Sequence, residues 1–140
     1  PEGFAAVADH FTAQPDTAVV VTGTTPADGI VGLAKRPVVD LSCRTSISEL
    51  VALLARADLF IGIDAGTLHI AGAAGARIVG LYGPSDHTFT GPQALHCRVV
   101  TSAVPCSPCF KSRCALGRVC MMGITPQQVI QAAEETLAEV

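Results

Sequence analysis

The chain has 140 residues, of which 49% are hydrophobic and only 15% are charged, so it is long and apolar enough to form one compact domain with a core. Its formal net charge of -3 and its scattered lysine and arginine residues exclude the basic stripe that binds a nucleic-acid backbone. Glycine and charged residues interrupt every apolar run, so no segment reaches the roughly 18 residues that a membrane-spanning helix requires.

Short runs rich in β-branched residues recur along the chain and predict five strands. Their hydrophobicity is continuous rather than alternating, which is typical of strands covered on both faces in a parallel sheet. The intervening segments predict helices, so the pattern indicates a doubly wound α/β fold, a Rossmann-like parallel sheet with helices on both faces. The predicted strands cover residues 17–22, 37–41, 58–64, 77–82 and 97–101.

The strongest helix candidate in the first half of the chain covers residues 46–57. Ser46 and Glu49 have the S-x-x-E spacing of a capping box at its start. Residues 1–12 and about 26–35 are weaker helix candidates. The apolar face expected for helix 46–57 consists of Ile47, Leu50, Val51 and Leu54.

Two further helices are predicted after the third strand. Residues 66–75 are rich in glycine and alanine, which lets a helix backbone pack very closely on a sheet. A final helix begins after Thr125, which forms a second capping box with Gln128 and has Pro126 at the first helical position. Its expected apolar stripe is Val129, Ala133 and Leu137. Residues 84–123 predict a loop rich in cysteine and proline outside the strand at 97–101.

Segment 64–69 joins the end of a predicted strand directly to the start of a helix. This junction places free backbone N–H groups and the positive end of a helix dipole at the carboxyl edge of the sheet, where open α/β folds bind ligands. Gly66 would let a phosphate approach the backbone, and His69 lies one turn inside the helix, near the same mouth. The alternative is purely structural, with Asp64 as an N-cap and His69 as a packing residue.

The run from position 40 to position 86 (DLSCRTSISELVALLARADLFIGIDAGTLHIAGAAGARIVGLYGPSD) resembles the C-terminal domain of glycosyltransferase family 9, which contains the ADP-heptose:lipopolysaccharide heptosyltransferases. The last helix and residues 105–109 also fit, so the similarity covers most of the chain beyond about residue 38. The resemblance implies one half of a GT-B fold, in which two Rossmann-like domains face each other across a cleft. This chain would be the C-terminal, donor-binding half, with the N-terminal acceptor domain absent from it.

The family holds the phosphates and sugar of its donor with a D-[ST]-G-x-x-H segment, which Asp64, Gly66 and His69 match. Ala65 stands where the family usually carries serine or threonine, so a hydroxyl contact is missing, at a cost of about 0.5 to 1.5 kcal/mol. The resemblance implies that the helix start at Gly66 and Thr67 stabilises the leaving diphosphate with the help of His69, the one residue given a catalytic role. No metal is obligatory in this scheme.

Five further residues, from three places in the sequence, are assigned to the donor site by the same resemblance. Gly83, Pro84 and Ser85 match the family's G-P-[TS]-[DH] loop beside the donor, and the alternative is an ordinary turn followed by an acidic cap. Asp28 follows the first strand where family members hold the ribose hydroxyls, and the alternative is a solvated loop residue. Thr45 corresponds to a residue that lines the family's adenine pocket.

Four cysteines within fifteen residues form a second candidate site. Their number suits a tetrahedral zinc ion or a small iron–sulfur cluster, although only the first pair has the x2 spacing of a zinc knuckle. Interleaved Lys111, Arg113 and Arg118 would lower the thiol pKa values. Three interpretations stay open, namely a structural zinc site, disulfides and free thiols, while Cys43 and Cys97 are expected to be buried. The four cysteines are Cys106, Cys109, Cys114 and Cys120.

The sequence therefore predicts the donor-binding domain of an enzyme that transfers heptose from ADP-heptose to the lipopolysaccharide inner core. Because no initiator methionine or export signal is present, we expect a fragment of a cytoplasmic protein, with a peripheral place at the inner membrane left open. The catalytic base and the acceptor site would lie in the absent domain, so the fragment alone would be inactive. The alternatives are a noncatalytic nucleotide- or metal-binding module and a GT-B enzyme that uses another nucleotide sugar.

Overall fold

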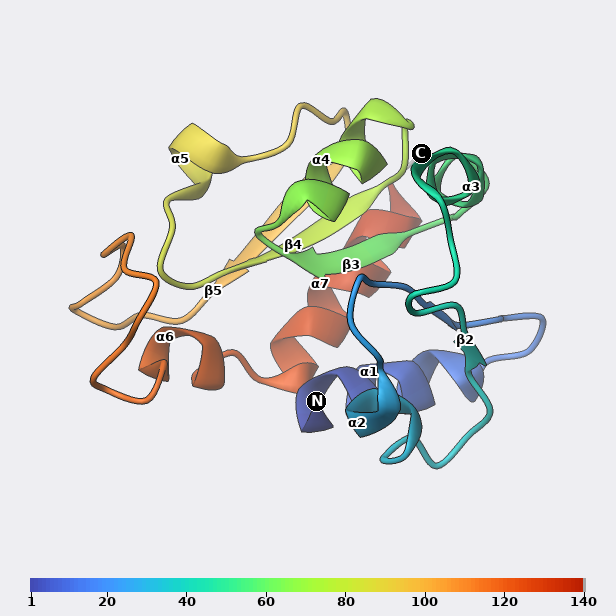
Figure 1. The fold of residues 1–140 in the computed structure, drawn as a ribbon, viewed down its shortest axis with the longest axis horizontal. Helices are drawn as coiled ribbons and strands as arrows, with labels where there is room; N and C mark the ends of the chain where they lie inside the picture. The colour runs from blue at the N-terminus through green and yellow to red at the C-terminus, as the bar shows by residue number, and fades with distance from the viewer. Residues whose placement is uncertain (140) are drawn as a thin grey trace. The chain divides into compact units, whose positions relative to one another are not determined.

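A computed structural model describes residues 1–139, which carry seven helices and five strands (Figure 1). The chain divides into two compact units, Pro1–Leu50 and Val51–Val140. Every strand pairing is parallel, as the continuous hydrophobic runs predict. Among the described residues, no helix combines the length and the apolar character needed to cross a membrane.

The first unit consists of helix α1 (Glu2–Thr12), strand β1 (Val20–Val21), helix α2 (Asp28–Val31) and strand β2 (Val39–Asp40). Strands β1 and β2 form a two-stranded parallel sheet, and each of them is shorter than the sequence predicts. Helix α1 contacts α2, and the Asp9 carboxylate at its end accepts hydrogen bonds from the backbone N–H groups of Lys35 and Arg36 at 2.7 and 3.0 Å. The helix candidate at 1–12 is present almost in full, whereas the candidate at about 26–35 is reduced to the single turn Asp28–Val31.

Helix α3 (Ile47–Leu54) runs from the end of the first unit into the second. Its capping box is confirmed, because Glu49 accepts from the Ser46 N–H at 2.7 Å and the Ser46 hydroxyl accepts from the Glu49 N–H at 3.3 Å. The expected apolar face is wrong for two of its members, since Ile47 is 73% exposed and Val51 is 40% exposed, while Leu54 is buried. Periodicity shows which side chains share a face but not whether another element covers them.

The second unit is built on a three-stranded parallel sheet in the order β3-β4-β5. Strand β3 covers Phe60–Ile63, β4 covers Ile78–Tyr82 and β5 covers Cys97–Thr101, and their register aligns Gly62 with Gly80 and Gly80 with Val99. The helices of this unit are α4 (Gly66–Ala73), α5 (His87–Thr90), α6 (Val119–Met122) and α7 (Pro126–Ala138). Single-turn helices α5 and α6 thus interrupt the loop expected at 84–123.

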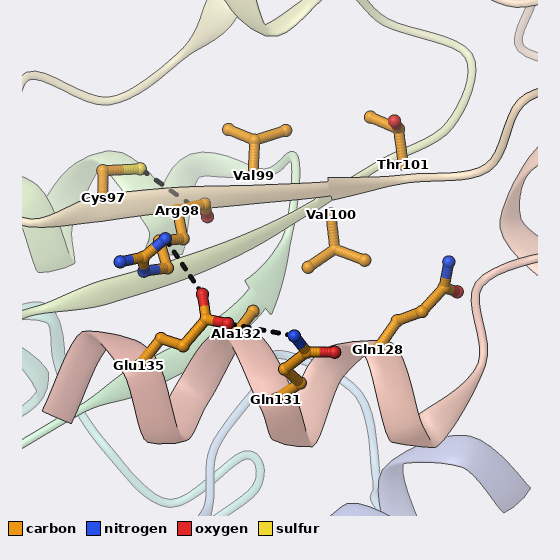
Figure 2. A pocket seen from close by; sticks show the side chains of 9 residues that line it. All are labelled: Cys97, Arg98, Val99, Val100, Thr101, Gln128, Gln131, Ala132 and Glu135. Atoms are coloured by element: carbon orange, nitrogen blue, oxygen red, sulfur yellow. Dashed lines mark hydrogen bonds and ion pairs between the residues drawn. The ribbon is translucent and has the colours of Figure 1, made fainter. Parts of the chain in front are cut away.

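Helices α4 and α7 lie on opposite sides of strand β4 (Figure 1). Leu68 of α4 is fully buried, and a Cβ added at Gly80 would lie 3.4 Å from it, which places α4 on that face of the sheet. Figure 2 shows that Val100 points toward α7 while Val99 points away, as alternation along a strand requires. Helices on both faces confirm the predicted fold class. Only β4 is buried along its whole length, however, since β3 and β5 are largely half-buried.

The sequence analysis expected the glycines of α4 to let this helix pack closely on the sheet, but the structure shows a different contact. A Cβ added at Gly72 would lie 3.0 Å from the carbonyl oxygen of Gln93, so this glycine admits the loop before β5 rather than a strand. The sheet side of α4 is instead formed by Leu68 and Ala71, which are both fully buried.

Helix α7 begins at its predicted capping box, in which the Thr125 N–H donates to Gln128 at 2.8 Å and the Thr125 hydroxyl accepts from the Gln128 N–H. Val129 and Ala133 are buried, as expected. The third member of the stripe is wrong, because Leu137 is half-buried and Thr136 is buried in its place. The Thr136 hydroxyl tolerates burial because it donates to the Ala132 carbonyl at 2.7 Å.

Replacing Thr125 by alanine should lower the free energy of unfolding by about 0.5 to 2 kcal/mol, because the substitution leaves the Gln128 N–H without its side-chain acceptor. Thr125→Ser keeps an acceptor oxygen in the same place and serves as the matched control. Urea unfolding followed by circular dichroism measures both variants. Equal stability of the alanine and serine variants would contradict a capping role.

Candidate functional site

The parallel register brings three strand ends to one edge of the sheet in the second unit. Ile63 lies opposite Leu81, and Leu81 lies opposite Val100, so β3, β4 and β5 finish side by side. The Asp64 N–H still reaches the Leu81 carbonyl at 3.3 Å. Segments 64–69 and 83–85 therefore leave the sheet at the same carboxyl edge, where ligands of open α/β sheets bind.

Helix α4 begins at this edge without a side-chain cap. Its N-cap residue is Ala65, in an extended conformation with φ -154° and ψ 169°, and no side chain bonds the first turn. The structural alternative for Asp64 is therefore wrong, because Asp64 does not cap this helix. The N–H groups of Gly66 and Thr67 lie before the first N–H group that can donate to a carbonyl within the helix. They therefore point out of the helix end and can donate hydrogen bonds to an anion.

His69 lies in the first turn of α4 and is exposed. The packing of this helix is made by Leu68 and Ala71, which are fully buried, so the alternative of a packing histidine is also wrong. Its role as a ligand stays a prediction.

Asp64 is half-buried and is held by a residue that the sequence analysis did not single out. Its Oδ2 atom accepts a hydrogen bond from the Thr90 hydroxyl at 3.1 Å. The backbone carbonyl of Thr90 accepts in turn from the Tyr82 hydroxyl at 3.2 Å. Tyr82 is only 1% exposed, and burial, followed by the negative charge of Asp64, raises the pKa of its phenol to about 12. The signal in the sequence that could have located Thr90 is Asp86, because an acidic N-cap at that position predicts a helical turn that ends near residue 90.

The turn at residues 83–85 is tied to the cysteine-rich loop. A Cβ added at Gly83 would clash with the Met121 sulfur, so glycine lets α6 pack against this turn without a shift of the Met121 side chain. The Gly83 carbonyl accepts from the Ser107 hydroxyl, and the Pro84 carbonyl accepts from the N–H groups of Cys109 and Phe110 at 2.9 and 2.7 Å. The carbonyls of this turn therefore serve the protein's own packing. Contact of Gly83 and Pro84 with a donor stays a prediction.

Asp86 caps helix α5, which confirms the structural alternative for this position of the G-P-S-D motif. Its Oδ1 atom accepts from the Thr88 hydroxyl at 2.7 Å and from the Thr88 N–H at 2.9 Å, and these bonds lower the pKa of the carboxyl group. Ser85 lines a cavity of about 250 Å³ beyond the end of β5. The hydroxyl groups of Thr101, Ser102 and Ser107 line the same cavity.

Asp28 and Thr45 belong to the first unit, whereas segments 64–69 and 83–85 belong to the second. Asp28 is exposed and begins helix α2, where its carbonyl accepts from the Gly32 N–H at 2.8 Å. Thr45 is half-buried next to the cap residue Ser46. The structure does not test whether these two residues share a site with Asp64, so their contacts with a nucleoside stay predictions.

The four clustered cysteines are free thiols and are not gathered around one point. Among residues 1–139, no three histidine, cysteine or acidic residues are placed so that they could hold a metal ion. Cys106 and Cys114 are exposed, Cys109 is half-buried and Cys120 is buried beside Gly83. A zinc site at Cys106, Cys109, Cys114 and Cys120 therefore stays a prediction without support from this arrangement.

The environments of the individual thiols differ in part from expectation. The pKa of Cys114 is lowered mainly by hydrogen bonds from the N–H groups of Arg118, at 3.3 Å, and Leu116, with smaller effects from the charges of Arg118 and Lys111. Cys97 is half-buried, and burial raises its pKa. The expectation for Cys43 is wrong, because it is exposed in a turn after β2 with φ 57°.

A larger cavity, of about 530 Å³, lies along β5 and α7, away from segment 64–69 (Figure 2). Arg98 of β5 crosses toward the helix and pairs with Glu135 at 3.1 Å and with Glu139 at 2.6 Å. His96 adds a contact to Glu139 at 3.0 Å, and Arg77 donates to the Glu139 carbonyl at 2.8 Å. These charges fasten the end of α7 to the sheet, so we assign this cavity no part in the candidate site.

Residues 1–120 match glycosyltransferase family 9 (heptosyltransferase). The chain belongs to glycosyltransferase family 9. Lipooligosaccharide heptosyltransferase 2 of Campylobacter jejuni is 32% identical over 100 residues, which cover 70% of this chain and 31% of that protein. Lipopolysaccharide heptosyltransferase 3 of Escherichia coli is 34% identical over 95 residues, which cover 64% of this chain and 28% of that protein. This glycosyltransferase family 9 chain thus spans under a third of the length of these relatives.

Solved structures show the same fold. The crystal structure of a family 9 glycosyl transferase from Veillonella parvula matches 99% of this chain and 42% of its own with a TM-score of 0.80 and 31% identity. The structure of E. coli ADP-heptose lps heptosyltransferase II matches 98% of this chain and 41% of its own with a TM-score of 0.76 at 24% identity. The fold class inferred from the alternation of strands and helices and the family inferred from residues 40–86 are therefore confirmed.

Tyr82 should ionise with a midpoint near 12 in the folded chain, against its ordinary value of 10.0. A raised pKa means that the folded state keeps a proton that the unfolded state releases, so stability is fully present below pH 10 and falls as the pH rises toward 12. Ultraviolet absorbance of the phenolate measures this directly, because the chain has one tyrosine and no tryptophan. The same midpoint with and without denaturant would show that the phenol is not buried.

Proposed function

We propose that this chain is the donor-binding part of a glycosyltransferase that transfers heptose from ADP-heptose to the lipopolysaccharide inner core. One observation carries the proposal most directly. Helix α4 of this family 9 chain starts without a side-chain cap at the carboxyl edge of the sheet, with Asp64 two residues before its start and His69 in its first turn. The names of the relatives support heptose as the sugar.

In this proposal the diphosphate of the donor binds at the first turn of α4. The N–H groups of Gly66 and Thr67 donate to the phosphate oxygens, and the helix dipole adds favourable potential. As the bond from sugar to phosphate breaks, negative charge grows on the diphosphate, and the exposed His69 donates a further hydrogen bond to it. These groups stabilise the leaving nucleotide without requiring a bound metal ion.

The sugar itself is assigned to Asp64. A carboxylate beside a diphosphate would repel it, but a carboxylate is a good acceptor for sugar hydroxyl groups. Thr90 bonds Oδ2, and among residues 1–139 no hydrogen bond is made to Oδ1. That second oxygen therefore accepts from a hydroxyl of the transferred sugar. Asp28 and Thr45 would hold the ribose and the adenine.

The general base and the acceptor site are assigned to a domain outside these 140 residues, consistent with the 31% of the Campylobacter relative that the chain covers. Transfer to an acceptor hydroxyl requires that a base remove its proton, and we assign that step to no residue of this chain. We place the protein in the cytoplasm, where it would meet its acceptor at the inner face of the membrane.

Titration calorimetry with ADP, UDP and ADP-heptose should show weak binding of both adenine compounds and weaker binding of UDP. The chain alone should transfer no sugar. Gly66→Pro should weaken ADP binding about tenfold or more, because it removes one N–H donor to a charged phosphate.

Proline is well tolerated at the first helical position after an extended residue, so Gly66→Pro should leave α4 folded. Gly66→Ala is the matched control, because it also adds a Cβ, which meets no protein atom within 4 Å, but keeps the N–H, so the difference between the two variants isolates the lost donor. A preference for UDP would point to another nucleotide sugar. Equal affinities of the proline and alanine variants would place the diphosphate elsewhere.

Ala65→Ser should tighten ADP binding by less than about 1.5 kcal/mol, the upper value for one net hydrogen bond, since it restores the hydroxyl that the family usually carries at this position. Ala73→Ser, at the exposed far end of the same helix, is the control and should leave the affinity unchanged. Calorimetry under identical conditions compares the two. Weaker binding by Ala65→Ser would mean that the added side chain caps the helix at the ligand's expense.

A further inference from the structure

We propose that Thr90 is a positioning residue for the donor site, with a hydroxyl group that fixes the Asp64 carboxylate so that one oxygen faces the sugar. The inference rests on the proposed function, because it concerns how Asp64 is presented to a donor. Thr90 is absent from the residues that the family resemblance assigns. It lies 26 positions further along the chain, at the end of helix α5.

The contact is a hydrogen bond to a charged acceptor. The Thr90 Oγ1 atom lies 3.1 Å from Asp64 Oδ2 and also 3.1 Å from the Asp86 carbonyl oxygen. A hydroxyl group has a single proton to donate, and a carboxylate is a stronger acceptor than an amide carbonyl. The proton therefore goes to Asp64, and the carboxyl group loses its freedom to rotate away from the edge of the sheet.

Thr90 can act in this way because its own backbone is held from both sides. Its N–H donates to the Asp86 carbonyl at 3.0 Å, and its carbonyl accepts from the fully buried Tyr82 hydroxyl at 3.2 Å. Asp86 in turn fixes the start of α5 through its bonds to Thr88. A path of hydrogen bonds thus runs from the buried strand β4 to the Asp64 carboxylate.

This path gives the G-P-S-D motif a second function. Asp86 caps α5, and α5 is a single turn long, so the cap determines where its last residue, Thr90, projects. The motif thereby acts on Asp64 through Thr90, without contacting the donor through Asp86. We infer that segments 64–69 and 83–86 work together because the second orients the acidic residue of the first.

The test compares Thr90→Val, which keeps the shape of the side chain but removes the hydroxyl, with Thr90→Ser, which restores the hydroxyl. Because Asp64 is assigned to the sugar and α4 to the diphosphate, Thr90→Val should weaken ADP-heptose binding about three- to tenfold and leave ADP binding unchanged. Thr90→Ser should bind ADP-heptose nearly as well as the parent chain. Phe89→Leu, on the same helix but with a side chain that is 84% exposed, is the control and should match the parent chain for both ligands.

A second measurement separates the inference from the proposed function. The side-chain carboxyl 13C resonance of Asp64 in the ligand-free chain should shift in Thr90→Val and return toward its parent position in Thr90→Ser. An unshifted resonance, or an equal loss of ADP and ADP-heptose affinity, would overturn the positioning role. If the parent chain binds neither adenine compound, the proposed function fails and with it the donor-site role of Thr90, while the resonance still decides whether Thr90 holds Asp64. Amide spectra of each variant verify that it folds.

Discussion

Complete burial of strand β4 is the constraint on which the second unit depends. All five of its residues are buried, with α4 on one face and α7 on the other, so both neighbouring strands must align to it. Burial on two faces also forces the strand's last residue, Tyr82, to find a partner for its hydroxyl inside the protein. The partner is the Thr90 carbonyl, and this bond holds Thr90 where its hydroxyl group reaches the Asp64 carboxylate.

The carboxyl edge of the sheet carries two kinds of polar group, which differ in how many of their hydrogen bonds are made within the protein. At α4 the N–H groups of the first turn have no side-chain cap, which leaves them available for an anion. At Asp64 one carboxylate oxygen is already bonded by Thr90, which leaves the other for a ligand. An edge that bonds some of its polar groups internally and leaves others in defined positions is preorganised for a ligand that carries both phosphates and hydroxyl groups.

Features that depend on neighbouring residues were predictable from the sequence, whereas contacts between distant residues were not. The capping boxes at Ser46 and Thr125 involve side chains three residues apart, and the five strands follow from apolar content alone. Burial of Ile47 was wrongly expected because it depends on a covering surface that periodicity does not reveal. The bond between Thr90 and Asp64 joins residues 26 positions apart through a turn whose direction is set by the cap at Asp86.

Ala65 affects the candidate site in two opposing ways. Without a side-chain hydroxyl it offers a donor no side-chain hydrogen bond, but it also cannot occupy the N–H groups of α4 with an internal cap. In the ligand-free protein a serine or threonine there would accept a hydrogen bond from one of those N–H groups. Binding of the ligand would break that bond, and its loss would offset part of the energy gained from the contact between the hydroxyl group and the ligand. The net loss caused by alanine is therefore smaller than one full hydrogen bond, and recognition shifts toward the N–H groups and toward Asp64. A site that relies on Asp64 to this degree gains the most from Thr90, since a carboxylate that is already oriented loses little freedom when the sugar binds.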